Sequence, residues 1–183
     1  EMRYNTKIYE YGCITHHTYS FIGASPDGIM EDGTMIEIKC PYSREITGKP
    51  KIEYFTQIQG QLEVCDLEYC DFLECKIRDY KDYESMIEDT KHIEDNLEKG
   101  VIIQVHDMKL GKDRDIICPI IDGEKEDYEK WIEEIFDKII KEDNLEYVKH
   151  MYWKLHLYSC VLVKRDKKLF DSFIPEIKQF WNE

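Results

Sequence analysis

The chain has 183 residues, of which 42% are hydrophobic and 35% charged, and its formal net charge is −14 at pH 7. This length and composition predict one folded globular domain with a substantial core, and no apolar run approaches the roughly 20 residues of a membrane span. The acidic balance argues against nucleic-acid binding through the overall field of the protein, although a local basic track is compatible with it.

The first predicted elements are two short strands. Residues 8–14 favour a strand, and residues 19–22 are predicted to pair with it after a turn at His16 and His17. Neighbouring histidines are able to bind a metal, but a pair in a turn flanked by threonines is more typical of a structural role.

The strongest local pattern lies in residues 23–41, which read GASPDGIMEDGTMIEIKCP. Near its end apolar residues alternate with Glu37 and Lys39, a period typical of a half-buried strand. This alternation places the two charged side chains next to each other on the polar face of the strand. Asp32 and Gly33 precede the strand and favour a hairpin, because Asp-Gly supplies the backbone angles that a tight turn needs.

The hairpin is predicted to fold Asp27 back toward Glu37. Two carboxylates, the backbone carbonyl of Ile38 and waters suit Mg²⁺, which takes oxygen ligands and keeps part of its hydration shell; Mn²⁺ is the expected substitute. Lys39 beside the ion is able to orient a water or to stabilise negative charge on a phosphate. These groups are the minimum for metal-assisted phosphodiester hydrolysis, and the alternative is a surface hairpin with an ordinary Glu–Lys pair.

A polar loop and a helix follow. Residues 42–52 are predicted to form a mobile loop that faces the substrate. From Glu53 the period becomes helical, with one apolar stripe and an adjoining polar face at i, i+3 and i+7. The loop contributes Arg44, Lys49 and Lys51 as a local basic track, the stripe consists of Phe55, Ile58, Leu62 and Cys65, and the polar face carries Tyr54, Gln57 and Gln61.

The rest of the chain is predicted to alternate between strands and helices. We expect a strand at 69–77, partial helix within 79–100, strands at 101–105 and 116–121, a helix at 124–140, a strand at 151–163, and a last helix capped by Asp166 with a new turn or a kink at Pro175. Pro119 favours an edge position for the strand at 116–121.

The Ser-Pro-Asp-Gly turn, the Glu-Ile-Lys-Cys-Pro strand and the Tyr54-to-Gln59 string YFTQIQ together resemble the PD-(D/E)xK nucleases, specifically the lambda exonuclease and YqaJ-type viral recombinase branch. The resemblance implies an α/β (α+β) fold with a restriction-endonuclease-like core, in which helices flank a central mixed sheet. It implies a single nuclease domain over residues 1–183 with a family-variable insertion at 79–150. The family also has upstream helices that carry an acidic residue and a phosphate-binding arginine. Nothing here matches them, so we expect a fragment.

The resemblance also implies a function, namely a Mg²⁺-dependent DNA exonuclease that degrades duplex DNA from its ends in recombination or repair. Its implied partners are double-stranded DNA ends, a single-strand annealing protein and a homo-oligomeric ring, without a membrane. Its expected location is intracellular, in the cytoplasm or nucleus of an infected host, which agrees with seven cysteines that show no paired spacing. The implied catalytic residues are Asp27, Glu37, Lys39 and Gln57, the metal ligands are Asp27, Glu37 and the Ile38 carbonyl, and the DNA contacts are Ser25, Arg44, Lys49, Lys51 and Tyr54.

Two alternatives stay open at this stage. The same metal core also serves structure-selective endonucleases and junction resolvases. A non-catalytic DNA-binding or assembly module is the other reading, which the acidic charge favours and the complete catalytic set disfavours.

Overall fold

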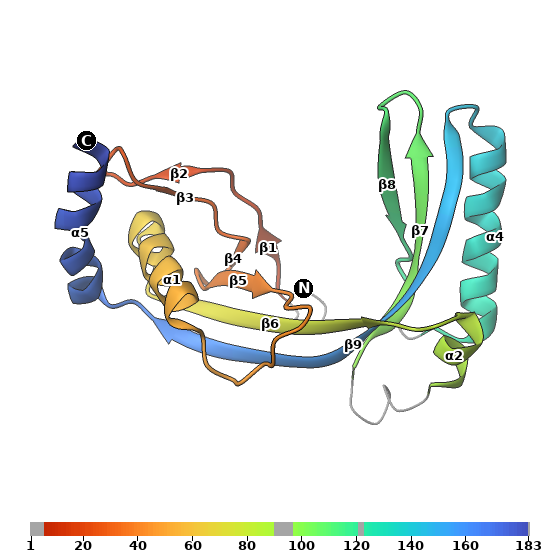
Figure 1. Ribbon diagram of the computed structural model, residues 1–183, viewed down its shortest axis with the longest axis horizontal. Coiled ribbons are helices and arrows are strands. Elements are labelled where there is room, and N and C mark those ends of the chain that lie inside the picture. The colour runs from red at the N-terminus through yellow and green to blue at the C-terminus, as the bar shows by residue number, and fades with distance from the viewer. Residues whose placement is uncertain (1–5, 90–96, 121–122, 183) are drawn as a thin grey trace. The chain divides into compact units, whose positions relative to one another are not determined.

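The computed structural model describes residues 6–89, 97–120 and 123–182. In chain order its elements are strands β1 (Ile8–Tyr9), β2 (Ile14–Thr15), β3 (Gly23–Ala24), β4 (Gly28–Met30) and β5 (Met35–Lys39), helix α1 (Ile52–Cys65), strand β6 (Tyr69–Asp79), helix α2 (Tyr83–Glu88), strands β7 (Lys99–Asp107) and β8 (Lys112–Ile117), helix α4 (Lys125–Lys141), strand β9 (Leu145–Lys164) and helix α5 (Lys167–Asn182) (Figure 1).

A seven-stranded mixed sheet joins most of these strands, in the order β1-β4-β5-β6-β9-β7-β8, and β2 pairs separately with β3. β5 and β6 are parallel, whereas the β1/β4, β4/β5, β7/β8 and β7/β9 pairs are antiparallel. The expected fold class, a central mixed sheet flanked by helices, is therefore confirmed. β8 is an edge strand, as expected, but it covers Lys112–Ile117 instead of 116–121, so Pro119 lies after the strand and not within it.

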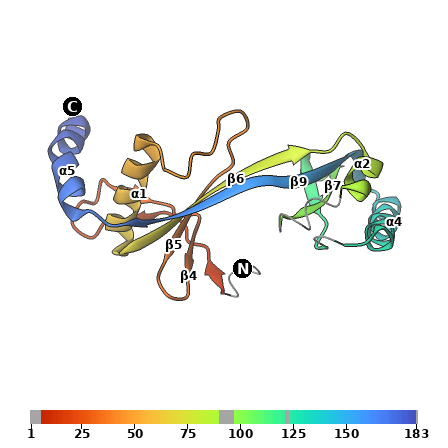
Figure 2. The ribbon, with the colours of Figure 1, turned by 90° about the horizontal axis from the view of Figure 1, so that it is seen from below.

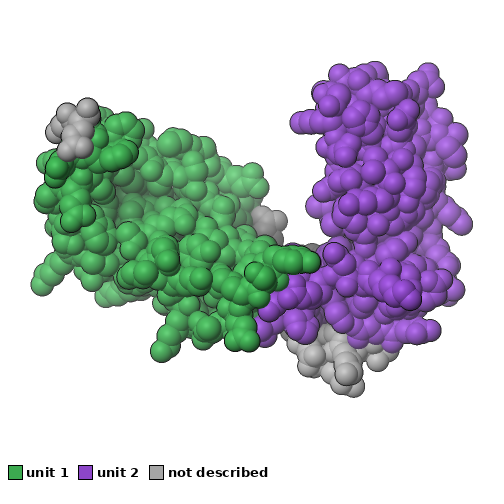
Figure 3. Space-filling view, viewed as in Figure 1, with its two compact units in different colours: residues 1–75, 158–183 green, residues 76–157 purple. Residues whose placement is uncertain are grey.

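The chain divides into two compact units (Figure 3). Unit 1 consists of Glu1–Cys75 and Tyr158–Glu183, and unit 2 of Lys76–Leu157. The insertion predicted at 79–150 falls within unit 2. Its status as a family-variable insertion into a single domain stays a prediction.

In unit 1, helix α1 packs its apolar stripe against strands β5, β6 and β9 (Figure 2). Its other sides contact α5 and the β2–β3 hairpin. The helix is thus enclosed by its neighbours, and residues on several of its faces are buried. The core of this unit consists of Met35, Ile58, Leu62, Cys70, Phe72 and Val163.

The carboxyl end of α1 is closed by Asp66, whose φ of 54° lies in the left-handed region. Asp tolerates this conformation better than most residues. The next amide, that of Leu67, donates to the carbonyl of Leu62 at 3.0 Å, and the Leu67 side chain packs on the core. This arrangement is the usual way to end a helix with a hydrophobic contact.

The first strands differ from the expected pairing. β2 pairs with Gly23–Ala24, while residues 19–22 belong to the connecting turn. The turn is built around His16, whose Nδ1 accepts hydrogen bonds from the amides of Thr18 (2.9 Å) and Tyr19 (3.2 Å). Its buried ring stacks on Phe170 of α5, and burial lowers its pKa. His16 therefore has the structural role that the sequence favoured, whereas His17 is exposed.

Unit 2 contains the β7–β8 hairpin, α2, α4 and the first part of β9. Alternate residues of β7 point into its core, and α4 covers them with Tyr128, Trp131 and Ile139. A capping box starts α4, in which the amide of Glu124 donates to Asp127 at 3.0 Å. The predicted helix at 124–140 is confirmed. Among the described helices none combines the length and apolar character of a membrane span. Helix α5 contains Pro175 and continues beyond it as one helix.

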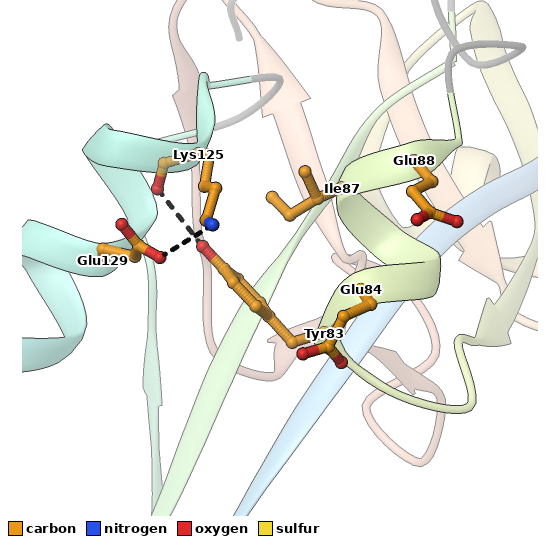
Figure 4. Close-up of a pocket in the computed structure, with 6 residues that line it drawn as sticks. All are labelled: Tyr83, Glu84, Ile87, Glu88, Lys125 and Glu129. Carbon is orange, nitrogen blue, oxygen red and sulfur yellow. Dashed lines mark hydrogen bonds and ion pairs between the residues drawn. The ribbon is translucent and has the colours of Figure 1, made fainter.

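A pocket of about 240 Å³ lies between α2 and α4 in unit 2 (Figure 4). Within it the Tyr83 hydroxyl donates to the backbone carbonyl of Lys125 at 3.2 Å, and the Lys125 ammonium pairs with Glu129 at 3.5 Å. Burial raises the pKa of Tyr83 to about 12. The lining includes no residue that the sequence assigned to the catalytic or DNA-binding set.

Candidate active site

The predicted hairpin is present and brings Asp27 to the strand of Glu37. β4 and β5 pair antiparallel, and Gly33 takes a φ of 85° in the turn between them. The carboxylate of Asp27 accepts a hydrogen bond from the backbone amide of Ile38, at 2.7 Å. Asp27 is exposed, so one end of the site faces solvent.

Glu37 is 2% exposed and receives hydrogen bonds from three side chains. Lys39 and Gln57 both donate to its Oε1, the second at 2.8 Å, and Gln61 donates to its Oε2, also at 2.8 Å. A carboxylate offers about four lone-pair positions, so these bonds occupy three of them. Glu37 is therefore fixed in place and keeps acceptor capacity for a further ligand.

The face of β5 that carries Glu37 is buried, which differs from the expectation of a half-buried strand with its apolar side inward, and Ile36 on the opposite face is buried as well. Glu37 lies beneath α1, whereas Ile38 on the opposite face is 42% exposed. The reason is that α1 supplies glutamines to this face. Their amides compensate the buried carboxylate without adding charge.

The glutamines of α1 have different tasks. Gln57 and Gln61 are four residues apart and lie on one face of the helix, where both reach Glu37. Gln59 is fully buried on another face. Its amide donates to the carbonyl of Lys164 at 3.0 Å and accepts from the amide of Asp166 at 2.6 Å, so it fixes the start of α5.

Gln61 is a site residue that the sequence-based assignment missed. Its signal was present, because Gln61 shares the i, i+3, i+7 face of Tyr54 and Gln57. Gln59, which completes the resemblance string, serves the structure of unit 1 instead.

A second buried carboxylate, Glu74, lies next to this group. In the parallel β5–β6 pair it stands opposite Lys39, and it is 1% exposed. It forms an ion pair with Arg44 from the loop after β5. The guanidinium carbon of Arg44 lies 5.2 Å from the ring centre of Tyr54, and the Lys39 ammonium lies 5.3 Å from the same centre.

The remaining predicted DNA contacts lie at the surface of unit 1. Ser25, two residues before Asp27, is exposed, and Lys49 and Lys51 are exposed in the loop before α1. Arg44 differs from these lysines, because its ion pair fixes it. Burial lowers the pKa of Arg44, but the hydrogen bonds and charges of Glu74 and Tyr54 together raise it more, so the net shift is upward.

The oxygen atoms of the site fit a hard divalent cation. Asp27 and Glu37 are anchored on neighbouring positions of the hairpin, and the Ile38 carbonyl belongs to the same strand. Within the described residues no group of three or more His, Cys, Asp or Glu side chains converges as a metal site. A two-carboxylate site completed by a carbonyl and waters is the type that Mg²⁺ favours.

Comparison with protein families matches residues 1–68 to the YqaJ-like viral recombinase domain. The chain is also 35% identical, over 217 aligned positions, to an uncharacterised protein of Acanthamoeba polyphaga mimivirus. That alignment covers 98% of this chain and 40% of the viral protein. The resemblance to the YqaJ-type branch is thereby confirmed for the segment that carries the hairpin and α1.

Two solved structures have a similar fold. They are an alkaline exonuclease from Laribacter hongkongensis, with a TM-score of 0.52, and the same exonuclease in complex with dAMP, with a TM-score of 0.51. Both are 22% identical to this chain, and each match covers 99% of this chain and 58% of the exonuclease. The chain thus spans less than two thirds of the proteins that it resembles.

Proposed function

Because residues 1–68 match the YqaJ-like viral recombinase domain and the fold is that of an alkaline exonuclease, we propose that this chain is a metal-dependent deoxyribonuclease. The observation that carries the proposal is the buried Glu37, held by Lys39, Gln57 and Gln61 one residue from the amide that binds Asp27. A surface Glu–Lys pair would need none of this enclosure.

Asp27, Glu37 and the Ile38 carbonyl would hold Mg²⁺ or Mn²⁺. When bound, the cation supplies Lewis-acid stabilisation of the phosphate and a water of lowered pKa. Gln57 and Gln61 keep the Glu37 carboxylate in one orientation, so it does not need to reorganise during the reaction. Both are neutral amides and add no charge near the ligands.

Lys39 supplies the positive charge next to Glu37. Its ammonium lies between the Glu37 carboxylate and the Tyr54 ring. From there it is able to hold the attacking water or to neutralise charge that develops on the phosphate oxygens. The Lys39 ammonium also lies over the face of the Tyr54 ring, which is a favourable cation–π interaction.

We propose that the substrate is duplex DNA, which the enzyme degrades from its ends in recombination or repair. The likeness to an alkaline exonuclease and the recombinase name of the matched family support this reading. Ser25, Arg44, Lys49 and Lys51 would contact the backbone. A single-strand annealing partner and a homo-oligomeric ring are further proposals that rest on the resemblance to lambda exonuclease.

The test compares a linear 5′-phosphorylated duplex with a covalently closed circle of the same sequence, in Mg²⁺ and in EDTA. We expect degradation of the linear DNA only, dependent on Mg²⁺. Asp27→Asn and Glu37→Gln should each reduce the rate at least about 100-fold, with thermal unfolding measured to confirm that the variants fold. Cleavage of the circle would favour an endonuclease, and binding without cleavage would favour an assembly module.

A further inference from the structure

Glu74 is a charged residue that directly follows two buried apolar residues on one face of β6. It follows Cys70 and Phe72 on the face of β6 that α1 covers, and both of these residues are fully buried. The Glu74 side chain is equally buried, and its Oε2 accepts no hydrogen bond from the described part of the chain. An unsatisfied buried carboxylate oxygen is costly.

Stability does not explain this residue. A buried ion pair is often no more stable than apolar side chains of the same volume, because both charges lose their hydration. Its partner Arg44 keeps 22% of its side chain exposed. We therefore attribute to Glu74 an effect on the position of the Arg44 side chain, and not on the stability of the hydrophobic core.

Arg44 is held beside the cation of the catalytic strand. Its guanidinium and the Lys39 ammonium lie 5.2 and 5.3 Å from the centre of the same Tyr54 ring. The ring itself is supported by Phe72, at 5.8 Å between ring centres. The two cations are therefore held against one ring, and each is ion-paired with a buried glutamate, Lys39 with Glu37 and Arg44 with Glu74.

We propose that Glu74 is a positioning residue, which fixes Arg44 on Tyr54 beside Lys39 and so builds a two-cation site for one backbone phosphate of the DNA. This inference rests on the proposed function. A guanidinium suits the task because its planar fork matches two phosphate oxygens. Fixing it in advance spares the entropy of ordering a long side chain when the substrate binds.

The experiment measures binding of a short fluorescent 5′-phosphorylated duplex in Ca²⁺, which takes the same type of oxygen ligand as Mg²⁺. The variants are Glu74→Gln, Glu74→Leu and Arg44→Ala, alone and combined with one another. Glu74→Leu combined with Arg44→Ala removes both partners of the ion pair and should fold about as well as the wild type, whereas each single Glu74 variant leaves Arg44 unpaired, so its folding is checked by thermal unfolding. If one of the Glu74 variants fails to fold, the other carries the test.

We expect the Glu74 variants to bind DNA several-fold more weakly, although each removes a negative charge. The slope of log affinity against log salt should fall by about 0.9, which corresponds to one phosphate contact. Adding Arg44→Ala to a Glu74 variant should cause no further loss. Glu63→Gln is the matched control, because it removes another buried glutamate that pairs with an arginine in unit 1, and it should leave the slope unchanged.

Tighter binding by the Glu74 variants would overturn the inference, since it would mean that Glu74 only neutralises Arg44. Additive losses in the double variants would overturn it as well. In both cases DNA binding and Mg²⁺-dependent cleavage by the wild type would leave the proposed nuclease function intact. A wild-type chain that binds no duplex would contradict both.

Discussion

The carboxylate of Glu37 depends on side chains from two elements. Lys39 belongs to its own strand, whereas Gln57 and Gln61 reach it from α1. Lys39 and Gln57 share Oε1, while Gln61 alone binds Oε2. We therefore expect different effects on metal binding and catalysis when each of the three donors is removed.

We predict that Gln61→Leu weakens Mn²⁺ binding about 10-fold or more, because partners that orient a ligand typically matter by this amount. Isothermal titration measures it. Gln59→Leu is the matched control from the same helix. It should lower the thermal midpoint by releasing Lys164 and Asp166, and leave the Mn²⁺ affinity unchanged. Wild-type affinity in Gln61→Leu would show that Oε2 needs no such partner.

Lys39→Met should behave in the opposite way. Its ammonium occupies Oε1 of Glu37, so its removal should leave Mn²⁺ affinity unchanged or raise it. The rate of DNA hydrolysis should fall at least about 100-fold, because a positioned cation or proton donor contributes this much. Lys168→Met, at an exposed position of α5, should change neither. Joint loss of metal binding and folded structure would make Lys39 a structural residue.

At the scale of elements, Arg165 joins the end of α1 to the start of α5. Its guanidinium donates to Glu63 at 2.7 Å and to Asp66 at 2.8 Å. Glu63 and Arg165 are largely buried, with side chains 5% and 10% exposed. The hydrogen bond from Arg165 lowers the pKa of Glu63 from its ordinary value of 4.5.

This shift gives the stability a predictable pH dependence. A lowered folded-state pKa stabilises the fold above the unfolded value of 4.5, and this contribution is lost as the pH falls through the folded pKa. Glu63→Gln should therefore reduce the free energy of unfolding by about 1–3 kcal/mol near neutral pH. Urea titrations at two pH values should show that the difference from wild type shrinks in acid. An equal difference at both would contradict the assignment.

The hairpin could be predicted because its signals are local. Asp32 and Gly33 specify the turn, and the alternation around Glu37 specifies the strand, so the approach of Asp27 follows from sequence alone. The burial of Glu37 could not be predicted, since it depends on where α1 packs. The same holds for Glu74, because only the parallel register of β5 and β6 places it opposite Lys39.

For the whole molecule, the two units have separate hydrophobic cores, which share no residue within the described ranges. All proposed site residues belong to unit 1, and all except Glu74 fall within the segment that matches the family domain. Unit 2 contains its own pocket and core. The predicted chemistry thus depends on unit 1, within a chain whose net charge of −14 opposes DNA binding overall.

The last prediction separates local charge from net charge. Lys49→Ala/Lys51→Ala should lower the slope of log DNA affinity against log salt by up to about 1.8, which is the effect of two phosphate contacts. Lys130→Ala/Lys168→Ala also removes two positive charges, but from exposed positions on α4 and α5. It should lower the DNA affinity slightly and leave the slope against log salt unchanged. Fluorescence anisotropy with the same duplex over a range of salt concentrations measures both. Equal slopes in the two double variants would mean that the loop before α1 is merely solvated, and that the DNA backbone does not pass over it.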